Sequence, residues 1–416
     1  MYTNFLIIGA SHAGLSALDA IRRCDPDAAV TVIAAEKTEP YSPTALPYVI
    51  SGKTQPERTG LRKPDFFENL GVDFINGASV TRVNTTANQV VLDDGRTIGY
   101  KKLLVASGAS ALIPEISGIE EVNFASIRTM ADAVSIQKQS AMADSAVIIG
   151  AGFIGMHTAE SLFKSGLKVS VIEAFDHVMP TSFDTQASEF IKSIFVENGI
   201  CVLTGKKVTK LFESDGKKMV ALDDGETVSG DMLVISTGIN PNINFLAGSG
   251  IDCKDGVVVD NRMRTSVPNV WAAGDVAVCS QFFSQRKSIG GTIPCATDQG
   301  VTAGMDMVED RYARDYPGNL NMNTFGFFDN FAFSIGKITS DASDDEVAIQ
   351  TDAGKISFSR FTFEDDVLTG VSAINRRLDP GILKELILRR TDLSSRKNDF
   401  IKAPLETGRQ VMRELF

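Results

Sequence analysis

Two stretches of the chain share one order of apolar and polar positions: an apolar run, a glycine-rich turn, an amphipathic stretch and a second apolar run. The more regular copy reads VIIGAGFIGMHTAESLFKSGLKVSVIE at 147–173. Its first apolar run, 146–149, is typical of a fully buried parallel strand, and 168–172 predicts the next strand. Between them the pattern predicts a helix at about 153–165, which ends at Gly166. This copy therefore predicts a complete β-α-β unit.

Three glycines in this copy, Gly150, Gly152 and Gly155, have the G-x-G-x-x-G spacing of a dinucleotide-binding turn. The first permits the tight turn, the second lets the backbone approach a pyrophosphate, and the third lets the helix pack close to the strand. Phe153 and Ile154 begin the predicted helix, whose free N–H groups and positive dipole end would face the phosphates. The copy therefore predicts a dinucleotide site.

The residue that closes the second strand, Glu173, bears on the choice of cofactor. A carboxylate at this position hydrogen-bonds the ribose hydroxyls and repels a 2′-phosphate, whereas NADP sites usually place an arginine nearby. The next four residues, 174–177, contain neither Arg nor Lys. NAD(H) is therefore favoured over NADP(H), and the alternative is a surface glutamate that only ends a strand.

The second copy reads FLIIGASHAG at 5–14 and departs from the pattern at its middle position. Gly9 and Gly14 keep the first and third glycines, while Ser11 replaces the second. Serine is small enough for close approach, so we expect a weakened site that is still present. Glu36 follows the next predicted strand, again in the position for a ribose.

Two such units imply two dinucleotides, and two dinucleotides in one chain imply electron transfer between them. The order of motifs resembles the pyridine nucleotide-disulfide oxidoreductase superfamily, whose first unit holds FAD and whose inserted second unit holds NAD(P)H. Three further motifs follow in the same order: YKKLLVASGA at 100–109, LVISTG at 233–238 and VWAAGD at 270–275. Residues 297–300 resemble the helix segment whose N-terminus points at the flavin ring, where its dipole would stabilise negative charge.

The resemblance implies an α/β fold with two Rossmann-like three-layer domains, one for FAD and one for NAD, and a C-terminal α+β interface domain. The predicted domains are FAD-binding at 1–112 and 236–318, NAD(H)-binding at 113–235, and interface at 319–416. The implied FAD contacts are Gly9, Ser11, His12, Ala13, Gly14, Glu36, Lys37, Thr44, Val80, Ser107, Gly108, Gly274 and Asp275. The implied NAD(H) contacts are Gly150, Gly152, Phe153, Ile154, Gly155 and Glu173, and Gly238 at the return crossing completes the cofactor-binding set.

The C-terminal segment has its own pattern. It opens with an aromatic-rich stretch at 325–333, continues with an alternating stretch at 355–363 that predicts a strand, and predicts a helix at about 380–390.

The segment at 36–52 contains no cysteine. In the disulfide reductases of the superfamily a redox cysteine pair lies in this region, and in its NADH oxidases and peroxidases one cysteine does. Thr44 occupies the corresponding position, and a hydroxyl forms neither a thiolate nor a disulfide at ordinary pH. Thiol-based chemistry is therefore excluded, and electrons must leave the flavin by another route.

The five cysteines lie far apart, without a C-x-x-C pair or spacing for a metal or a cluster, so we predict no metal site. They are Cys24, Cys201, Cys253, Cys279 and Cys295. We expect each to be a small buried apolar residue, and Cys295 lies near the predicted flavin-facing helix. The scatter is typical of a reducing cytoplasm.

Three residues are candidates for catalysis. The resemblance makes Phe153 a gate on the flavin face and places Glu160 near the nicotinamide, although Glu160 could instead be a solvated helix residue. His12 matches a histidine that assists peroxide chemistry in the NADH oxidases and peroxidases. Without the partner cysteine it could instead be a polar residue at the start of a helix.

Composition excludes other classes. The chain has 416 residues and a net charge of −11, which disfavours nucleic acid as a partner. No apolar run approaches the roughly 20 residues of a membrane span. Because the first copy begins at the start of the sequence, we expect no cleavable signal peptide ahead of it and a cytoplasmic location.

Three stretches, 40–53, 386–393 and 404–409, resemble the FAD-containing subunits of 2-oxoacid oxidoreductase complexes. That resemblance implies a multi-subunit complex in which iron–sulfur and thiamine-diphosphate subunits are partners and this chain exchanges electrons with NAD(H). One alternative is a stand-alone NADH:rubredoxin or ferredoxin reductase. Another, of a different class, is a flavin-binding scaffold subunit without turnover.

Overall fold

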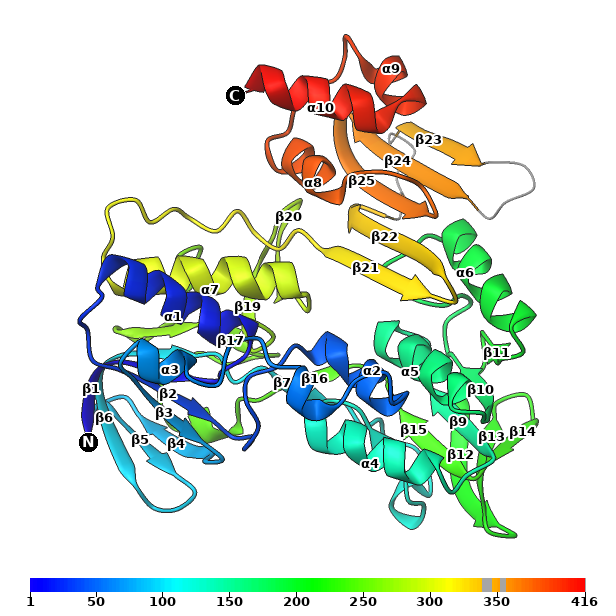
Figure 1. Cartoon of the computed structure of the whole chain (residues 1–416), viewed down its shortest axis with the longest axis horizontal. Helices are drawn as coiled ribbons and strands as arrows, with labels where there is room; N and C mark the ends of the chain where they lie inside the picture. Colours follow the sequence, from blue (N-terminus) through cyan, green and yellow to red (C-terminus); the bar gives the residue numbers. More distant parts are fainter. Residues whose placement is uncertain (339–345, 352–356, 416) are drawn as a thin grey trace. The chain divides into compact units, whose positions relative to one another are not determined.

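The computed structural model describes residues 1–338, 346–351 and 357–415, and the chain forms two compact units (Figure 1). The first unit contains Met1–Leu112, Arg128–Ala133 and Ile239–Leu320. The second unit contains Ile113–Ile127, Val134–Gly238 and Asn321–Phe416. Each unit includes one of the two glycine-rich turns. The predicted domain boundaries stay predictions, because compactness does not say which segment binds which cofactor.

The first unit is built on a sheet of order β3-β2-β1-β6-β5-β4, with β18 beside β6. Strands β1, β2, β3, β6 and β18 run parallel, so their carboxyl ends meet at one edge. The strands span Tyr2–Ile8 (β1), Val30–Ala34 (β2), Val72–Asn76 (β3), Val80–Asn84 (β4), Gln89–Leu92 (β5), Thr97–Val105 (β6) and Val270–Ala272 (β18). The predicted strand at the first turn is therefore confirmed.

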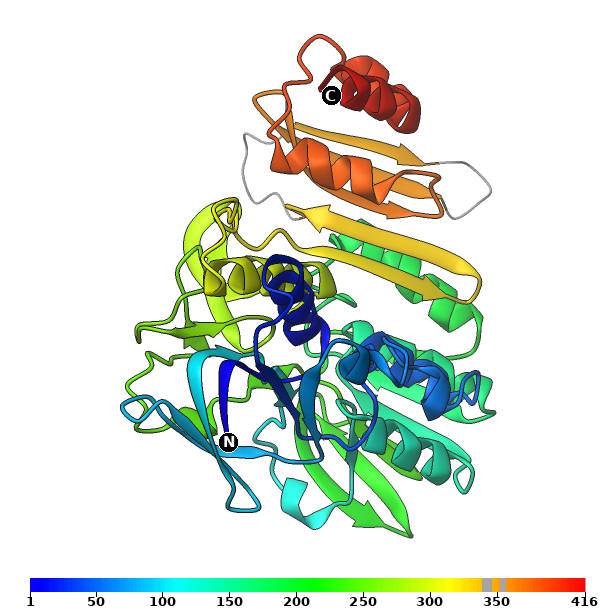
Figure 2. The ribbon, with the colours of Figure 1, turned by 60° about the vertical axis from the view of Figure 1, so that its left-hand side comes forward.

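Two helices of the first unit, α1 (His12–Cys24) and α7 (Ile293–Met307), lie side by side in Figures 1 and 2. Their backbones approach so closely that a Cβ on Gly300 would lie 2.2 Å from the carbonyl oxygen of Ala13. The contact fixes α7 against the helix that follows the first glycine-rich turn.

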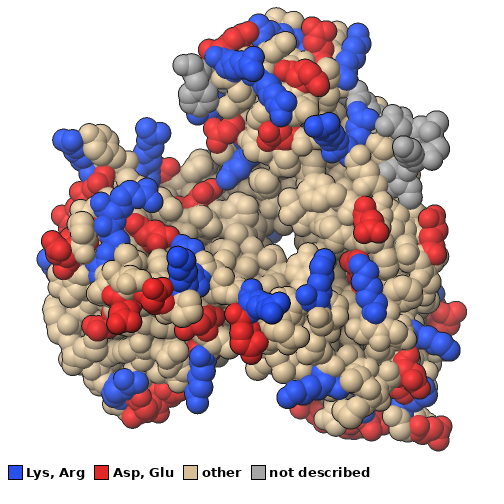
Figure 3. Space-filling view, in the orientation of Figure 1, with Lys and Arg blue, Asp and Glu red and all other residues tan. Residues whose placement is uncertain are grey.

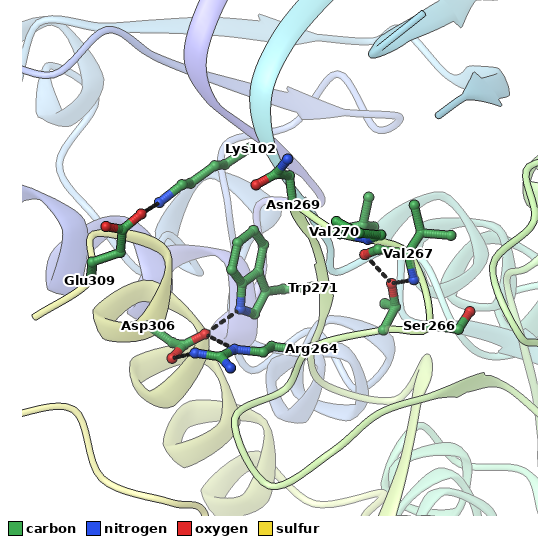
Figure 4. A pocket seen from close by; sticks show the side chains of 11 residues that line it. Lys102, Arg264, Ser266, Val267, Asn269, Val270, Trp271, Asp306 and Glu309 are labelled. Carbon is green, nitrogen blue, oxygen red and sulfur yellow. Dashed lines mark hydrogen bonds and ion pairs between the residues drawn. The ribbon is translucent and has the colours of Figure 1, made fainter. Parts of the chain in front are cut away.

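The carboxyl end of α7 is held by a buried acid, Asp306, whose side chain is 4% exposed. Arg264 donates to both of its oxygens at 2.6 and 2.7 Å, and the indole Nε1 of Trp271 donates at 2.8 Å (Figure 4). Burial alone would raise the pKa of Asp306, but these bonds hold it below its ordinary value. Lys102 extends the group, because its Nζ donates to Met307 O and to the Glu309 carboxylate, both at 2.6 Å.

Smaller elements complete the first unit. Strand β7 (Ala109–Ala111) pairs antiparallel with β16 (Ile239–Pro241), so the segments where the chain leaves this unit and returns to it form one ladder. A second small sheet has the order β17-β19-β20. Its strands are Val257–Val258, Ala277–Gln281 and Ser284–Ile289. The short helical segments are η1 (Pro43–Ala45), α2 (Leu46–Ile50), η2 (Pro56–Arg58), α3 (Phe66–Asn69) and η4 (Asn244–Leu246).

The second unit contains the more regular copy, and its predicted elements are confirmed. Strand β9 (Ser145–Ile149) is followed by α5 (Phe153–Lys164) and β10 (Lys168–Ile172). The parallel sheet has the order β11-β10-β9-β15-β8, and a hairpin sheet has the order β12-β13-β14. The other elements are η3 (Ile119–Glu121), β8 (Ala125–Ser126), α6 (Thr185–Glu197), β11 (Cys201–Leu203), β12 (Val208–Ser214), β13 (Lys217–Leu222), β14 (Thr227–Gly230) and β15 (Met232–Ile235). Helix α4 (Met130–Ser140) begins in the segment Arg128–Ala133 of the first unit and continues in the second.

The C-terminal part of the second unit is an antiparallel sheet of order β21-β22-β25-β24-β23, seen in Figure 2. Its strands are Met322–Phe327, Asn330–Gly336, Val367–Ile374, Phe358–Glu364 and Glu346–Thr351. Helix α8 (Pro380–Leu388) packs on β22 and β25, and confirms the predicted helix. Helices α9 (Lys397–Lys402) and α10 (Pro404–Leu415) follow. The predicted strand at 355–363 is confirmed from residue 358 on, and residues 355–356 lie outside the described residues.

A mixed sheet with a parallel core in the first unit, a parallel sheet in the second and an α+β C-terminal part confirm the predicted α/β fold class. Acidic and basic side chains lie interspersed on the face drawn in Figure 3. In the described ranges, no helix is both long and apolar enough to cross a bilayer.

We expect Asp306→Asn to destabilise the first unit by about 1–3 kcal/mol, because the variant loses the charged acceptor of Arg264 and leaves buried groups poorly paired. Trp271 is the single tryptophan of the chain, so its fluorescence during urea unfolding reports this unit. The folded pKa of Asp306 is lowered, so its stabilising effect is full at pH 7 and disappears as the pH falls below about 4. Asp73→Asn, at an exposed position on β3, is the matched control. An equal urea midpoint for Asp306→Asn and wild type at pH 7 would contradict this account.

Candidate functional site

The first glycine-rich turn is closed to side chains at two positions. Gly9 has φ +109°, and a Cβ there would lie 2.1 Å from Ala106 O. A Cβ on Gly14 would lie 1.9 Å from Gly9 O, so α1 can begin this close to β1 only with glycine at that position. The turn therefore directs the N-terminus of α1 to the carboxyl edge of the sheet, where an anion would meet free N–H groups.

The middle position of the turn tolerates the serine. Ser11 is the N-cap of α1 and has extended backbone angles, φ −98° and ψ −162°. The matching Gly152 in the second turn is also extended, at φ −73° and ψ −178°, and a Cβ there would meet nothing within 4 Å. Glycine is therefore not needed for the backbone at this position, and Ser11 only takes up space beside the turn.

The acid after β2, Glu36, is held by one partner five residues away and by another distant in sequence. Tyr41 OH donates to its two carboxylate oxygens at 2.9 and 2.8 Å, and Met130 N–H donates at 3.2 Å. Burial and the Glu36 charge raise the pKa of Tyr41, so its phenol remains a donor. The carboxylate is thus fixed at the edge of the sheet where a ribose ligand is predicted.

Arg128 is a site residue that the sequence analysis missed. Its Nη2 lies 2.6 Å from the Asp275 carboxylate, and its Nε donates to Ala109 O at 2.6 Å. Asp275 is the predicted flavin-binding acid, so Arg128 places a positive charge directly beside it. No motif indicated this pair, because the partners are far apart in sequence and Arg128 lies outside the glycine patterns.

Hydrogen bonds to Gln299 and Asn242 hold the remaining loops of the predicted first site. Gly274 N–H donates to Gln299 Oε1 at 2.8 Å, and Gln299 is fully buried on α7. Ser107 Oγ donates to Asn242 O at 2.9 Å, and Asn242 N–H donates to Gly108 O at 3.0 Å. Gln299 and Asn242 are therefore further residues that position predicted site loops.

Three polar side chains form a hydrogen-bonded chain beside the first turn. His12 Nε2 lies 3.0 Å from Ser42 Oγ, which lies 2.8 Å from Thr44 Oγ1. Burial, and then the charge of Arg62, lower the pKa of His12. Thr44, which is predicted to take the redox-cysteine position, is exposed.

Three further predicted cofactor contacts of the first unit differ in their burial. Ala13 is buried on α1, and Val80 is half-buried at the start of β4. Lys37 is exposed, and its stem covers Gly77, where a Cβ would lie 2.6 Å from Lys37 Cγ.

The second glycine-rich turn repeats the geometry of the first. Gly150 has φ +104°, and a Cβ there would lie 2.2 Å from Ser236 O. A Cβ on Gly155 would lie 2.0 Å from Gly150 O. Gly238, with φ +136°, follows β15 at the end of the parallel-sheet segment. The open space at Gly152 and the free N-terminus of α5 suit a pyrophosphate.

The acid after β10, Glu173, is 8% exposed. Its carboxylate accepts from Ala151 N–H at 2.7 Å and from Phe175 N–H at 3.1 Å. Each oxygen keeps lone-pair capacity for a ribose hydroxyl. The acid is thus tied to the glycine-rich turn of its own copy.

One face of α5 packs against the aromatic strand β21 and the turn after it. Phe153 is half-buried, with ring centroids 6.1 Å from Phe183 and 5.8 Å from Phe325. Ile154 is also half-buried, at the start of the helix. His157 lies edge-on to Phe325 at 4.6 Å, and burial lowers its pKa to about 4, so it is neutral at pH 7. His157 was also missed, because its surroundings come from a distant strand.

Glu160 is 8% exposed, so the alternative of a solvated helix residue is wrong. Its Oε1 accepts from Lys164 Nζ at 2.6 Å and from Phe328 N–H at 2.9 Å. The distant Phe328 covers it, which the helix pattern alone does not reveal.

The described residues contain no group of three or more His, Cys, Asp and Glu side chains placed to hold a metal ion. The expected burial of the cysteines is confirmed for Cys279 and Cys295 and is wrong for Cys24 and Cys201. Both exposed cysteines lie at the end of an element, where the core no longer covers them.

A pocket of about 400 Å³ lies apart from both turns, around Trp271 and the carboxyl end of α7 (Figure 4). It contains none of the predicted site residues. Its charged side chains are paired with one another, as described above for Asp306 and Lys102.

Comparison with known proteins supports the geometry. Residues 3–300 match the family described as pyridine nucleotide-disulphide oxidoreductase. The chain is 38% identical over 414 residues to the NADH-dependent phenylglyoxylate dehydrogenase subunit epsilon of Aromatoleum evansii, covering 99% of this chain and 98% of that protein. It is 25% identical to putidaredoxin reductase from Pseudomonas putida, over 93% of this chain and 92% of the other.

Solved structures share the fold. The water-forming NADH oxidase from Lactobacillus brevis bound to NADH superposes with a TM-score of 0.87 at 21% identity, covering 99% of this chain and 100% of that one. The family match, and the two turns with their acids, make FAD and NAD(H) the cofactors. The chain belongs to the pyridine nucleotide-disulphide oxidoreductases and is an FAD-dependent NAD(H) oxidoreductase.

Proposed function

We propose that this chain is the electron-transfer subunit of a 2-oxoacid dehydrogenase complex of the phenylglyoxylate type, and that it passes electrons between an iron–sulfur partner and NAD⁺. The observation that carries the proposal is the combination of two dinucleotide turns, one regular and one with Ser11 at its middle position, with the absence of any cysteine at 36–52, where Thr44 is predicted to take the redox position. An oxidoreductase with both sites and no thiol in this segment must exchange electrons with a group outside the chain.

FAD would lie in the first unit. Gly9, Gly14 and the N-terminus of α1 would face its pyrophosphate, Glu36 its adenosine ribose, and Asp275 with Arg128 the segment near the ribityl chain. Flavin supplies the ability to exchange electrons singly on one side and as hydride on the other. Hydrogen bonds within the chain hold these groups, from Tyr41 to Glu36, from Arg128 to Asp275 and from Gly274 to Gln299.

NAD(H) would lie in the second unit. Gly150, Gly152 and Gly155 would face its pyrophosphate, and Glu173 its ribose hydroxyls. Phe153 and Ile154 would complete the contacts at the start of α5. Glu160 forms an ion pair with Lys164 and accepts a hydrogen bond from Phe328 N–H. These contacts favour a role in positioning over one in proton transfer.

The partner is proposed from the 38% identical relative, which is a subunit of an NADH-dependent phenylglyoxylate dehydrogenase. The other subunits would bind the 2-oxo acid, thiamine diphosphate and iron–sulfur clusters, for which this sequence has no motif. A second candidate is a stand-alone reductase of a small iron–sulfur carrier, favoured by the likeness to putidaredoxin reductase.

Anaerobic addition of NADH to the purified yellow protein should bleach the flavin absorbance within the mixing time of a spectrophotometer. If the flavin is bound but NADH does not bleach it, the scaffold alternative replaces the enzyme.

The variant Arg128→Ala should retain less FAD than wild type, because Asp275 then has no paired charge beside it. Arg23→Ala, on the far end of α1, is the control for this loss.

Glu173→Gln should weaken NADH binding by about 1–3 kcal/mol, since a charge-assisted hydrogen bond to the ribose becomes a neutral one. Adding Ala174→Arg should raise the affinity for NADPH, because position 174 is exposed next to the acid. Tryptic resistance and FAD content serve as controls for folding. Unchanged NADH affinity in Glu173→Gln would mean that the ribose lies elsewhere.

The two partner candidates differ in what accompanies the chain. Affinity purification from native expression should recover iron–sulfur and thiamine-diphosphate polypeptides in fixed ratio with this chain. Reduction of a small soluble carrier by the isolated chain, with no copurifying subunits, would favour the stand-alone reductase instead.

A further inference from the structure

The hydrogen-bonded chain beside the first turn links solvent to the predicted flavin site. Thr44 is exposed, while Ser42 and His12 are half-buried. The distances are 2.8 Å from Thr44 Oγ1 to Ser42 Oγ and 3.0 Å from Ser42 Oγ to His12 Nε2. His12 is the first residue of α1, directly after the glycine-rich turn. The three side chains thus form a continuous path from the surface to that turn.

Electron transfer between an iron–sulfur partner and NAD⁺ requires that one proton be exchanged with solvent for each NADH formed or oxidised. A hydride contains one proton and two electrons. A cluster that delivers two electrons one at a time delivers no proton, so each NADH formed needs one proton from solvent. In the opposite direction, each NADH oxidised releases one proton when its two electrons leave singly.

We infer that Thr44, Ser42 and His12 are a proton relay between solvent and the flavin of this chain, an inference that rests on the proposed function. Each hydroxyl can donate its own proton while it accepts another, and each imidazole nitrogen can accept or donate. The segment that holds a redox thiol elsewhere in the superfamily would here conduct protons.

The surroundings of His12 suit this role. Arg62 faces it with a positive charge that disfavours the imidazolium, and Asp275 faces it with a negative charge that favours it. Arg62 is itself paired with Asp19 at 2.6 Å, and Asp275 with Arg128. Burial and Arg62 prevail, so the imidazole is neutral at pH 7 and ready to accept a proton. Its position at a helix N-terminus disfavours a lasting positive charge, so an accepted proton is readily passed on.

The transfer balances in atoms. The Ser42 hydroxyl gives its proton to His12 Nε2, and Ser42 Oγ takes the Thr44 proton in exchange. Thr44 Oγ1 is reprotonated by solvent water. The imidazolium would then give up the proton on its other ring nitrogen, Nδ1, towards the cofactor, and exchange of the remaining ring proton from Nε2 to Nδ1 would restore the starting tautomer. One proton enters at Thr44 for each proton that leaves at His12, and no redox step occurs on these residues.

Proton uptake during flavin reduction tests the relay without NADH. The FAD-containing protein would be reduced anaerobically by a photochemically generated one-electron donor, in weak buffer with a pH indicator. We expect wild type to take up protons in step with the loss of flavin absorbance. Thr44→Val and Ser42→Ala, which each break the chain, and His12→Gln, which cannot titrate, should slow uptake at least about tenfold.

Two variants serve as controls. Ser42→Thr keeps the hydroxyl and should restore uptake. Thr81→Val removes an exposed threonine hydroxyl on β4 of the same unit and should behave as wild type.

A second measurement is the titration of the His12 imidazole, followed by its ¹⁵N resonances. The midpoint of this titration should shift in Ser42→Ala. An unshifted titration would show that Ser42 does not contact the ring and would overturn the relay.

The outcomes separate the relay from the proposed function. Variants that keep FAD, are bleached by NADH and take up protons at the wild-type rate would overturn the relay alone. Wild-type protein that binds FAD but is not reduced by NADH would overturn the proposed function, while the photochemical uptake would still decide the relay. Loss of FAD in Thr44→Val, an exposed position, would show a structural role and would also overturn the relay.

Discussion

Both sites depend on one close contact within each glycine-rich turn. The carbonyl oxygen of the first glycine lies where a Cβ on the third glycine would be. In the first unit this oxygen belongs to Gly9 and the missing Cβ to Gly14, and in the second unit to Gly150 and Gly155. The contact brings each helix N-terminus to the carboxyl edge of its sheet. The direction of the helix dipole and the position of the acid at the end of the next strand both follow from it.

The elements nearest this contact could be predicted from sequence, because their cause is local. Glycine spacing, apolar runs and a terminal acid are all encoded within about 30 residues of a β-α-β unit. The strands β9 and β10 and the helix α5 accordingly agree with the pattern. The predicted strand of the C-terminal part agrees where the chain is described, since its alternation is equally local.

The residues that sequence reasoning missed share a different cause. Arg128 is defined by Asp275 and His157 by Phe325, and each pair joins segments far apart in the chain. An arginine or a histidine carries no sign of its partner until the fold brings the two together. The same holds for Glu160, which a helical pattern leaves open to solvent and Phe328 covers. Burial of this kind is a property of the assembled structure.

The two copies also differ in what holds their acids. Glu173 accepts hydrogen bonds from Ala151 and Phe175, within its own β-α-β unit. Glu36 instead depends on Tyr41 and on Met130, which lies in the segment Arg128–Ala133 that returns to the first unit, and Arg128 of that segment pairs with Asp275. The acid of the second unit is therefore held within its own motif, whereas the acid of the first unit depends partly on a distant segment. In the second unit the regular motif holds its own acid. In the first unit, where Ser11 alters the motif, a distant segment helps to hold the acid.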